Sequence, residues 1–438
     1  MYVFIEVCYN EYMKILGIET SCDETAASVV EDGVKILSNV VVSQIDIFAE
    51  YGGVIPEVAA RSHLEAMMPV IDKALADAGC SWDDIDAIAV THAPGLLGSL
   101  LIGTLTARTL AILHDKPLYA VHHLKSHVYA NWLVETRVLT EPIFSDARLE
   151  FSSTSYAGRP GKTAPRGSFL GAVRNIRVEN SNHVMHPKKQ VSATRVPTFP
   201  LLALVVSGGH TQILYMPGHN RFEIVGTTRD DAVGECFDKV AKILGLPYPG
   251  GPAIAAATEG HPILLGHAQG RSAKPTVLER QDDLQPGNPN RYPLPHPKIY
   301  GLDFSFSGLK TAVLRAVQKE VGVPISYPSH KLKELLSEQQ VCDFAASFQK
   351  TAVDILVEKL KKAMEQFPDT KSIVVAGGVS ANKTLRDALS NAYFPAPSLS
   401  GDNGAMVAAA CYYEIQSGVK PVDPYKLNIY PRIDIAQH

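Results

Sequence analysis

The chain has 438 residues, of which 46% are hydrophobic and 20% are charged, and its formal net charge at pH 7 is −4. This composition is that of a globular protein with apolar material for more than one core, and it excludes a disordered chain or a polybasic binder. No two cysteines have a CxxC spacing, so the pattern indicates neither a zinc ribbon nor a disulfide framework and favours a reducing compartment. The cysteines are Cys8, Cys22, Cys80, Cys236, Cys342 and Cys411.

The N-terminus and the longest apolar stretch argue against export and membrane insertion. Residues 1–14 carry two Glu and no Arg, unlike a mitochondrial transit peptide, and their apolar run is too short and too acidic for a signal sequence. Residues 93–113 are apolar but include Arg108 and four Ser or Thr residues, which predicts a buried core helix rather than a membrane span. We expect a soluble cytoplasmic protein with no membrane partner.

Two segments share one pattern, in which a strand, a polar turn, a second strand and a Gly-containing turn follow one another. They cover residues 14–33 and residues 201–218. The similarity suggests a duplicated α/β unit.

Further strand–turn–helix units follow each segment. Residues 85–90 predict a strand that leads into the apolar helix, and residues 372–376 predict a strand that leads through Gly377-Gly378 to a helix near Ala381. Alternating strands and helices favour a parallel or mixed sheet with helices on its faces.

Residues 137–198 do not fit this pattern. They show no clear periodicity, are rich in Ser, Thr, Pro, Gly and Asn, and hold ten Lys and Arg against four Asp and Glu. We interpret them as an inserted, basic and largely disordered loop that could add electrostatic affinity for a nucleic acid.

The segment His122-His-Leu-Lys-Ser-His127 is the densest cluster of metal-ligand residue types in the chain. His123 and His127 are four positions apart and share a helix face, which is a metal-ligand spacing. Two packed or solvated histidines are an equal alternative from this pair alone. A zincin peptidase needs Glu after the first His as its general base, and Leu124 stands at that position.

Asp402 is a candidate third ligand, in the segment that opens a helix predicted over residues 405–415. In isolation, an ordinary helix N-cap is the more common role for such a residue. Two imidazoles and one carboxylate with open positions would suit iron(II) or zinc.

Three Gly-rich turns could bind phosphate through backbone N–H groups, at residues 207–211, 248–252 and 376–382. Each alone is more often a plain turn, but three together indicate a nucleotide site. Acidic residues lie near these turns and near the first strand. Asp238 could accept hydrogen bonds from a ribose, whereas a solvated helix face is the preferred interpretation for Asp230.

Ten sequence blocks, in this order, resemble the bacterial branch of the TsaD family, also called OSGEP and once named O-sialoglycoprotein endopeptidases. The blocks are residues 16–25, 51–57, 95–100, 122–127, 206–211, 231–239, 248–252, 302–311, 377–382 and 402–406. The resemblance covers the chain except for the N-terminal dozen residues and the insert.

The resemblance implies an actin/Hsp70-like ATPase (ASKHA) fold, an α/β architecture of two duplicated RNase H-like lobes with an interlobe cleft. Residues 14–136 would form the first lobe with the metal-binding helix, and residues 137–198 the inserted basic loop. Residues 199–438 would form the second lobe, with the nucleotide-binding turns and a final helix that returns to the cleft.

The resemblance also implies an acyltransferase. It would transfer the threonylcarbamoyl group from threonylcarbamoyl-AMP to the exocyclic amine of the adenosine just 3′ of the anticodon in tRNAs that read ANN codons. One metal, usually iron(II) or zinc, would be bound by His123, His127 and Asp402. Adenylate-binding positions would be Val205, Val206, Ser207, Gly208, Gly209, Asp238, Gly251 and Asn382.

Threonylcarbamoyl-AMP is an activated mixed anhydride, so its reaction needs no protein nucleophile. Asp23 and Glu24 are the candidates for other catalytic roles. The resemblance implies the partners tRNA, TsaB and TsaE, with TsaC supplying the adenylate. A metallopeptidase with an HxxxH metal site is the competing enzyme class. A non-catalytic nucleotide-binding paralogue of the same fold is the second alternative.

Overall fold

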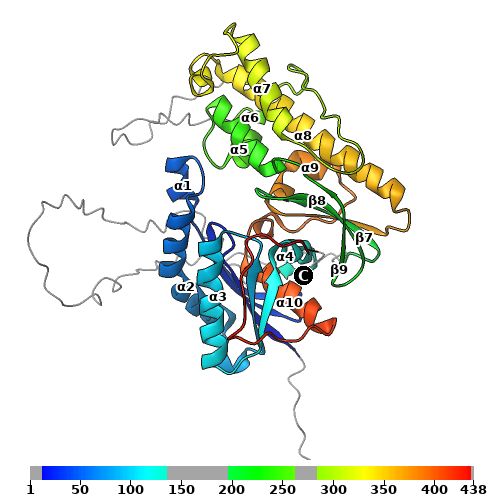
Figure 1. Ribbon diagram of the computed structural model, residues 1–438. Helices are drawn as coiled ribbons and strands as arrows, with labels where there is room; N and C mark the ends of the chain where they lie inside the picture. The colour runs from blue at the N-terminus through cyan, green and yellow to red at the C-terminus, as the bar shows by residue number, and fades with distance from the viewer. Residues whose placement is uncertain (1–11, 136–195, 262–283, 436–438) are drawn as a thin grey trace, which may run out of the picture. The chain divides into compact units, whose positions relative to one another are not determined.

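The computed structural model describes residues 12–135, 196–261 and 284–435 (Figure 1). A first sheet has the strand order β5-β4-β1-β2-β3-β6. Strands β1, β2 and β3 form an antiparallel meander, and β4 and β5 run parallel to β1. The strands are β1 (Lys14–Glu19), β2 (Glu24–Glu31), β3 (Lys35–Ser43), β4 (Ala87–Ala93), β5 (Leu118–His122) and β6 (Val134–Glu135).

A second sheet has the order β10-β7-β8-β9. Strands β7, β8 and β9 are antiparallel, and β10 is parallel to β7. The strands are β7 (Leu201–Val206), β8 (Thr211–Gly218), β9 (Arg221–Thr227) and β10 (Ser372–Ala376). Because this sheet repeats the order and directions of β4-β1-β2-β3, it confirms the predicted duplication and the α/β fold of two RNase H-like lobes.

The burial of β1 and β7 explains why the sequence predicted both repeated segments. Strand β7 is buried at every position, and β1 is buried at every position after Lys14. A strand covered on both faces needs a continuous apolar run, and these runs begin both repeated segments.

Helices α2 (Pro56–Ala78) and α3 (Leu97–Leu113) pack on one face of the first sheet. The short helix α1 (Ile45–Tyr51) precedes them in the chain. The other side of α3 is exposed, with exposed fractions of 43–70% at Leu97, Leu101, Leu105, Ile112 and Leu113. The prediction of a buried core helix is therefore wrong for half of α3. An apolar composition does not show which side of a helix a neighbour covers.

Helices α4 (His123–Tyr129) and α10 (Gly404–Gln416) lie in a core that both sheets share. Leu124 and Val128 of α4 and Ala408 of α10 are buried in one cluster with Ile15 of β1 and Val205 of β7. Although α10 is the last helix of the described residues, it packs on β1 and β2.

Five helices cover the second sheet and share a hydrophobic core with β7 and β8. They are α5 (Val233–Leu244), α6 (Gly250–Thr258), α7 (Ser307–Glu320), α8 (Glu338–Gln366) and α9 (Lys383–Ala388). Short 3₁₀ helices are η1 (Trp82–Asp84), η2 (Ala130–Trp132), η3 (Ser329–Glu334), η4 (Gly378–Ala381) and η5 (Pro397–Leu399).

Helix α8 begins with a capping box, in which the backbone N–H of Ser337 donates to Gln340 Oε1 and the backbone N–H of Gln340 donates to Ser337 Oγ. Nowhere in residues 12–135, 196–261 and 284–435 is there a helix with the length and apolar character that crossing a bilayer requires. Of the predicted basic insert, residues 137–198, all but residues 196–198 lie outside the described residues.

Candidate metal and substrate site

The sequence His122–His127 folds as the end of β5 followed by α4. His122 is the N-cap of α4, where its Nδ1 accepts from the backbone N–H of Leu124 at 3.2 Å. His123 and His127 follow on one face of the helix, with ring centroids 4.6 Å apart. The capping histidine therefore sets where the helix begins and which histidines share a face.

Asp402 faces these two histidines from the segment before α10. Its Oδ1 lies 3.2 Å from His127 Nε2 and 3.7 Å from His123 Nε2. Helix α10 is capped by Asn403, whose side chain accepts from the backbone N–H of Met406 at 2.9 Å. The N-cap alternative for Asp402 is therefore wrong by one residue, and its carboxylate is available to the histidines.

The triad fits a divalent metal ion. One ligand atom from each of His123, His127 and Asp402 lies within 4.8 Å of the others. In the described part of the chain, the buried ring nitrogens of His127 make no well-directed hydrogen bond, and Nε2 lies 3.2 Å from Asp402 Oδ1. A metal ion coordinated by Nε2 would give this nitrogen a well-directed partner. Two imidazoles and a carboxylate are ligands that both iron(II) and zinc accept.

The charges of the metal-free site are strongly coupled. Burial opposes ionisation of Asp402, but His123 and His127 lower its pKa to about 2. Burial opposes protonation of His123, but Asp402 and Glu19 raise its pKa to about 9. The metal-free triad therefore holds a buried ion pair where a cation would otherwise bind.

Two residues near the triad escaped the sequence analysis. Glu19, at the end of β1, is fully buried, and its Oε2 lies 3.2 Å from His123 Nδ1. Burial, followed by the charges of His123 and His127, lowers the pKa of His210 to about 4. The sequence signal for Glu19 was an acidic residue that closes an otherwise apolar strand.

The first Gly-rich turn joins β7 to β8. The backbone N–H of Ser207 donates to the carbonyl of His210 at 2.8 Å, and the backbone N–H of His210 donates to Ser207 Oγ at 3.1 Å. A Cβ added at Gly208 or Gly209 would meet nothing within 4 Å, so the space above the turn is open. The preceding Val205 and Val206 have fully buried side chains.

Two other glycines bring distant segments against this turn. The backbone N–H of Gly234, in the first turn of α5, donates to the Ser207 carbonyl at 3.2 Å. A Cβ on Gly234 would lie 2.6 Å from that oxygen. A Cβ on Gly377 would collide with the Val206 carbonyl oxygen. The first and third predicted phosphate turns therefore lie next to each other.

Asp238 of α5 holds the second Gly-rich turn. Its Oδ1 accepts from the backbone N–H of Gly250 at 2.7 Å. Burial and the nearby charge of Asp23 raise its pKa, although the Gly250 hydrogen bond opposes this. A Cβ at Gly251 would meet open space, as at the first turn.

Asn382 is already engaged by the protein. Its Oδ1 caps α9 by accepting from the backbone N–H of Leu385 at 3.1 Å, and its Nδ2 donates to Gln349 Oε1 at 2.8 Å. Its predicted role in adenylate binding stays a prediction.

The acidic candidates have distinct environments. Asp23 lies in the β1–β2 turn and is 9% exposed. Burial and the charges of Asp23 and Asp402 raise the pKa of Glu24 well above its ordinary value. Asp230 is exposed, as expected, but it is not on a helix: it precedes α5 and accepts from the backbone N–H of Phe306 at 2.8 Å and from the Ser307 hydroxyl at 2.6 Å. These partners were not predicted because they are more than 70 residues away in sequence.

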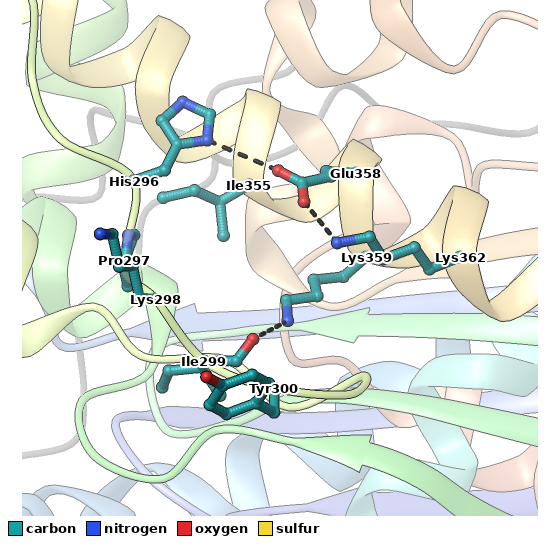
Figure 2. Close-up of a pocket in the computed structure, with 9 residues that line it drawn as sticks. All are labelled: His296, Pro297, Lys298, Ile299, Tyr300, Ile355, Glu358, Lys359 and Lys362. Carbon is teal, nitrogen blue, oxygen red and sulfur yellow. Dashed lines mark hydrogen bonds and ion pairs between the residues drawn. The ribbon is translucent and has the colours of Figure 1, made fainter.

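Another hollow lies between residues 296–300 and α8, with a volume of about 310 Å³ (Figure 2). Four of its polar side chains already have partners within the protein. Glu358 lies 3.6 Å from His296 and 2.7 Å from Lys362, and Lys359 donates to the carbonyl of Ile299 at 2.8 Å. None of its lining residues belongs to the predicted site.

Comparisons with known proteins agree with the resemblance. A family model, TsaD, described as tRNA N6-adenosine threonylcarbamoyltransferase, matches residues 35–145 and 180–409. A protein of that name from Symbiobacterium thermophilum is 40% identical over 415 residues, which cover 93% of each chain. Another of that name, from Thermomicrobium roseum, is 40% identical over 421 residues and covers 93% of each chain.

The solved structure of component A of (R)-2-hydroxyglutaryl-CoA dehydratase from Acidaminococcus fermentans shows a more distant likeness. It is 13% identical, with a TM-score of 0.40 over 92% of this chain and 99% of that chain.

Proposed function

This chain belongs to the tRNA N6-adenosine threonylcarbamoyltransferase (TsaD) family, and we propose that the site around His123, His127 and Asp402 performs its transfer reaction. The chain is an acyltransferase that modifies tRNA. The donor is threonylcarbamoyl-AMP, and the acceptor is the exocyclic amine of the adenosine next to the anticodon, in tRNAs that read ANN codons.

The convergence of the three candidate ligands carries this proposal. The buried Nε2 of His127 faces the Asp402 carboxylate at 3.2 Å, and Asn403 rather than Asp402 caps α10. A purely nucleotide-binding fold has no need for this arrangement. A zincin peptidase would need Glu at the position of the buried Leu124.

The reaction replaces one bond to the carbamoyl carbon with another. The amine nitrogen bonds to that carbon, the bond to the phosphate oxygen breaks, AMP leaves, and the nitrogen loses a proton. A metal held by the triad would supply a Lewis acid for the carbamoyl carbonyl. The open turn at Gly208 and Gly209 would hold the phosphate on backbone N–H groups, and the turn at Gly251 would allow the adenosine to approach closely.

The proton of the amine needs an acceptor, and Glu24 and Asp23 are the candidates. Burial and the charges of Asp23 and Asp402 raise the pKa of Glu24, so this carboxyl would hold a proton readily once it has accepted one. Asp23 would share this role or orient the amine. Asp238 would contact the ribose through the carboxylate oxygen that Gly250 leaves free.

Purified protein incubated with threonylcarbamoyl-AMP, unmodified tRNA and partner proteins tests the function. Nucleoside digestion and mass spectrometry should show threonylcarbamoyladenosine, and Asp402→Asn should abolish it. Product formation by the Asp402 variant at the wild-type rate would contradict this site, and cleavage of a glycoprotein by the pure protein would favour the peptidase.

We propose iron(II) as the resident metal, with zinc as the alternative. The mixed nitrogen and oxygen ligand set suits both ions. Elemental analysis of protein purified without oxygen would distinguish them, because iron(II) is lost or oxidised during aerobic purification and zinc is not.

We propose TsaB and TsaE as protein partners in the cytoplasm, with TsaC as the source of the adenylate. The exposed apolar side of α3 supports a protein partner, because apolar rows of this kind are uncommon on free surfaces. Co-purification with the homologous TsaB, compared with Leu101→Glu and Leu105→Glu variants, would test this contact.

We also propose the predicted lobe boundaries, with residues 14–136 and 199–438 as the lobes and residues 137–198 as a basic arm. The approach of Asp402, just before α10, to His123 and His127 supports the part of this proposal in which the final helix returns to the cleft.

A further inference from the structure

Glu19 is a buried carboxylate directly behind one of the candidate ligands. It is the last residue of β1, has an exposed fraction of 0%, and lies 3.2 Å from His123 Nδ1 through its Oε2. The Thr91 hydroxyl of the neighbouring strand β4 donates to the same oxygen at 2.6 Å. The backbone N–H of Ser21 donates to its other oxygen, Oε1. Donors from β4 and from the β1–β2 turn therefore fix the carboxylate.

The two histidines of the triad are held differently. His123 Nδ1 faces Glu19 and lies 3.2 Å from Ser21 Oγ, while its Nε2 faces Asp402. His127 Nδ1 has no hydrogen-bond partner in the described part of the chain. Only His123 therefore has a buried anion to set which ring nitrogen carries the proton.

We propose that Glu19 is a positioning residue for the metal centre. Its carboxylate accepts the Nδ1–H of His123, leaves the lone pair of Nε2 directed toward Asp402, and makes the imidazole a stronger ligand. A buried carboxylate is costly unless it is paired, and His123, 3.2 Å away, is the ionisable side chain that forms an ion pair with Glu19. This inference rests on the proposed metal triad.

Metal affinity measured by chelator competition with Co²⁺ or Zn²⁺ tests the proposal. Glu19→Gln keeps the shape of the side chain and removes its charge, so the dissociation constant should rise roughly 10- to 100-fold. Glu19→Asp keeps the charge but shortens the side chain by one methylene. It should also weaken metal binding, because the carboxylate would lie farther from His123 Nδ1. Glu31→Gln is the matched control, because Glu31 pairs with Lys35 at the far end of β2. The metal affinity of the Glu31→Gln variant should equal that of the wild-type protein.

The NMR spectrum of the zinc-loaded protein gives a second readout that does not depend on the measured affinity. A slowly exchanging, downfield imidazole Nδ1–H should be observed and should disappear in His123→Ala. In Glu19→Gln it should move upfield, which a merely structural role would not cause.

The outcomes separate this inference from the metal site itself. If the wild-type protein binds no metal, or if His123→Ala binds it at full stoichiometry, the triad assignment fails. If the wild-type protein binds metal and Glu19→Gln binds it equally well with an unmoved Nδ1–H signal, Glu19 has no positioning role.

Discussion

The backbones of Gly17, in the middle of β1, and Gly404, at the start of α10, are in direct contact. A Cβ on Gly404 would lie 2.6 Å from the Gly17 carbonyl oxygen, and a Cβ on Gly17 would collide with the Gly404 carbonyl oxygen. Asp402 is two residues before Gly404, and Glu19 is two residues after Gly17. This contact therefore determines how closely Asp402 approaches the histidines.

Gly404→Ala should separate the two segments and weaken metal binding as well as the fold. Overpacking of this kind costs about 1–3 kcal/mol, which urea unfolding would measure. Gly401→Ala is the matched control, because a Cβ there would meet nothing within 4 Å. Equal unfolding midpoints and equal metal affinities for both variants would contradict this role for the contact.

His123→Ala and Asp402→Ala should each abolish metal binding and threonylcarbamoyl transfer while the protein stays folded. Each change removes one of the three ligand groups that the described residues bring together. Elemental analysis together with circular dichroism would show the result. Full metal stoichiometry in either variant would refute the assignment of that residue.

Gly208→Val and Gly251→Ala should reduce the affinity for a non-hydrolysable adenylate analogue without a large loss of stability. Added side chains at both positions would enter open space, so they would obstruct a ligand rather than the protein. Isothermal titration calorimetry would measure the affinity, with Gly308→Ala in α7 as the control, since its Cβ also meets open space. Wild-type affinity in Gly208→Val would mean that the phosphate is bound elsewhere.

Metal affinity should rise about tenfold per pH unit between pH 6.5 and 8.5, because the proton on His123 must leave before its Nε2 can coordinate. The pKa of His123 is raised from 6.5 to about 9 in the metal-free protein, so this proton is still bound at neutral pH. Its contribution to the stability of the metal-free fold is complete below pH 6.5 and is lost as the pH rises through 9. Calorimetry at pH 7.5 in buffers of different ionisation enthalpy should detect about one released proton, and pH-independent affinity above pH 7 would contradict the raised pKa.

Deletion of residues 146–179, which the family model does not match, should weaken tRNA binding mainly at low salt. The segment holds six Lys and Arg against three Asp and Glu, so its contribution should be electrostatic and screened by salt. The slope of log affinity against log salt should become shallower, with adenylate binding unchanged. Loss of metal or adenylate binding would show that the segment has a structural role.

The sequence alone predicted those features that depend on residues close together in the chain. The helical spacing of His123 and His127 predicted their shared face, because four residues on a helix return to the same side. The apolar runs of β1 and β7 predicted central strands and the duplication. The same local signals misplaced the cap of α10 by one residue, since Asp402 and Asn403 are both good capping residues.

The tertiary structure decided which residues meet across long separations. Asp402 reaches His127 from the far end of the chain because two glycines let α10 approach β1, and Glu19 reaches His123 across 104 residues. Asp230 binds the start of α7 through contacts that lie 76 residues away in sequence, although its local surroundings suggested a solvated face. Composition and periodicity predict which side chains of a segment face water and which face a core. They do not predict the hydrogen-bond partner of a polar side chain, because that partner depends on which segments pack together.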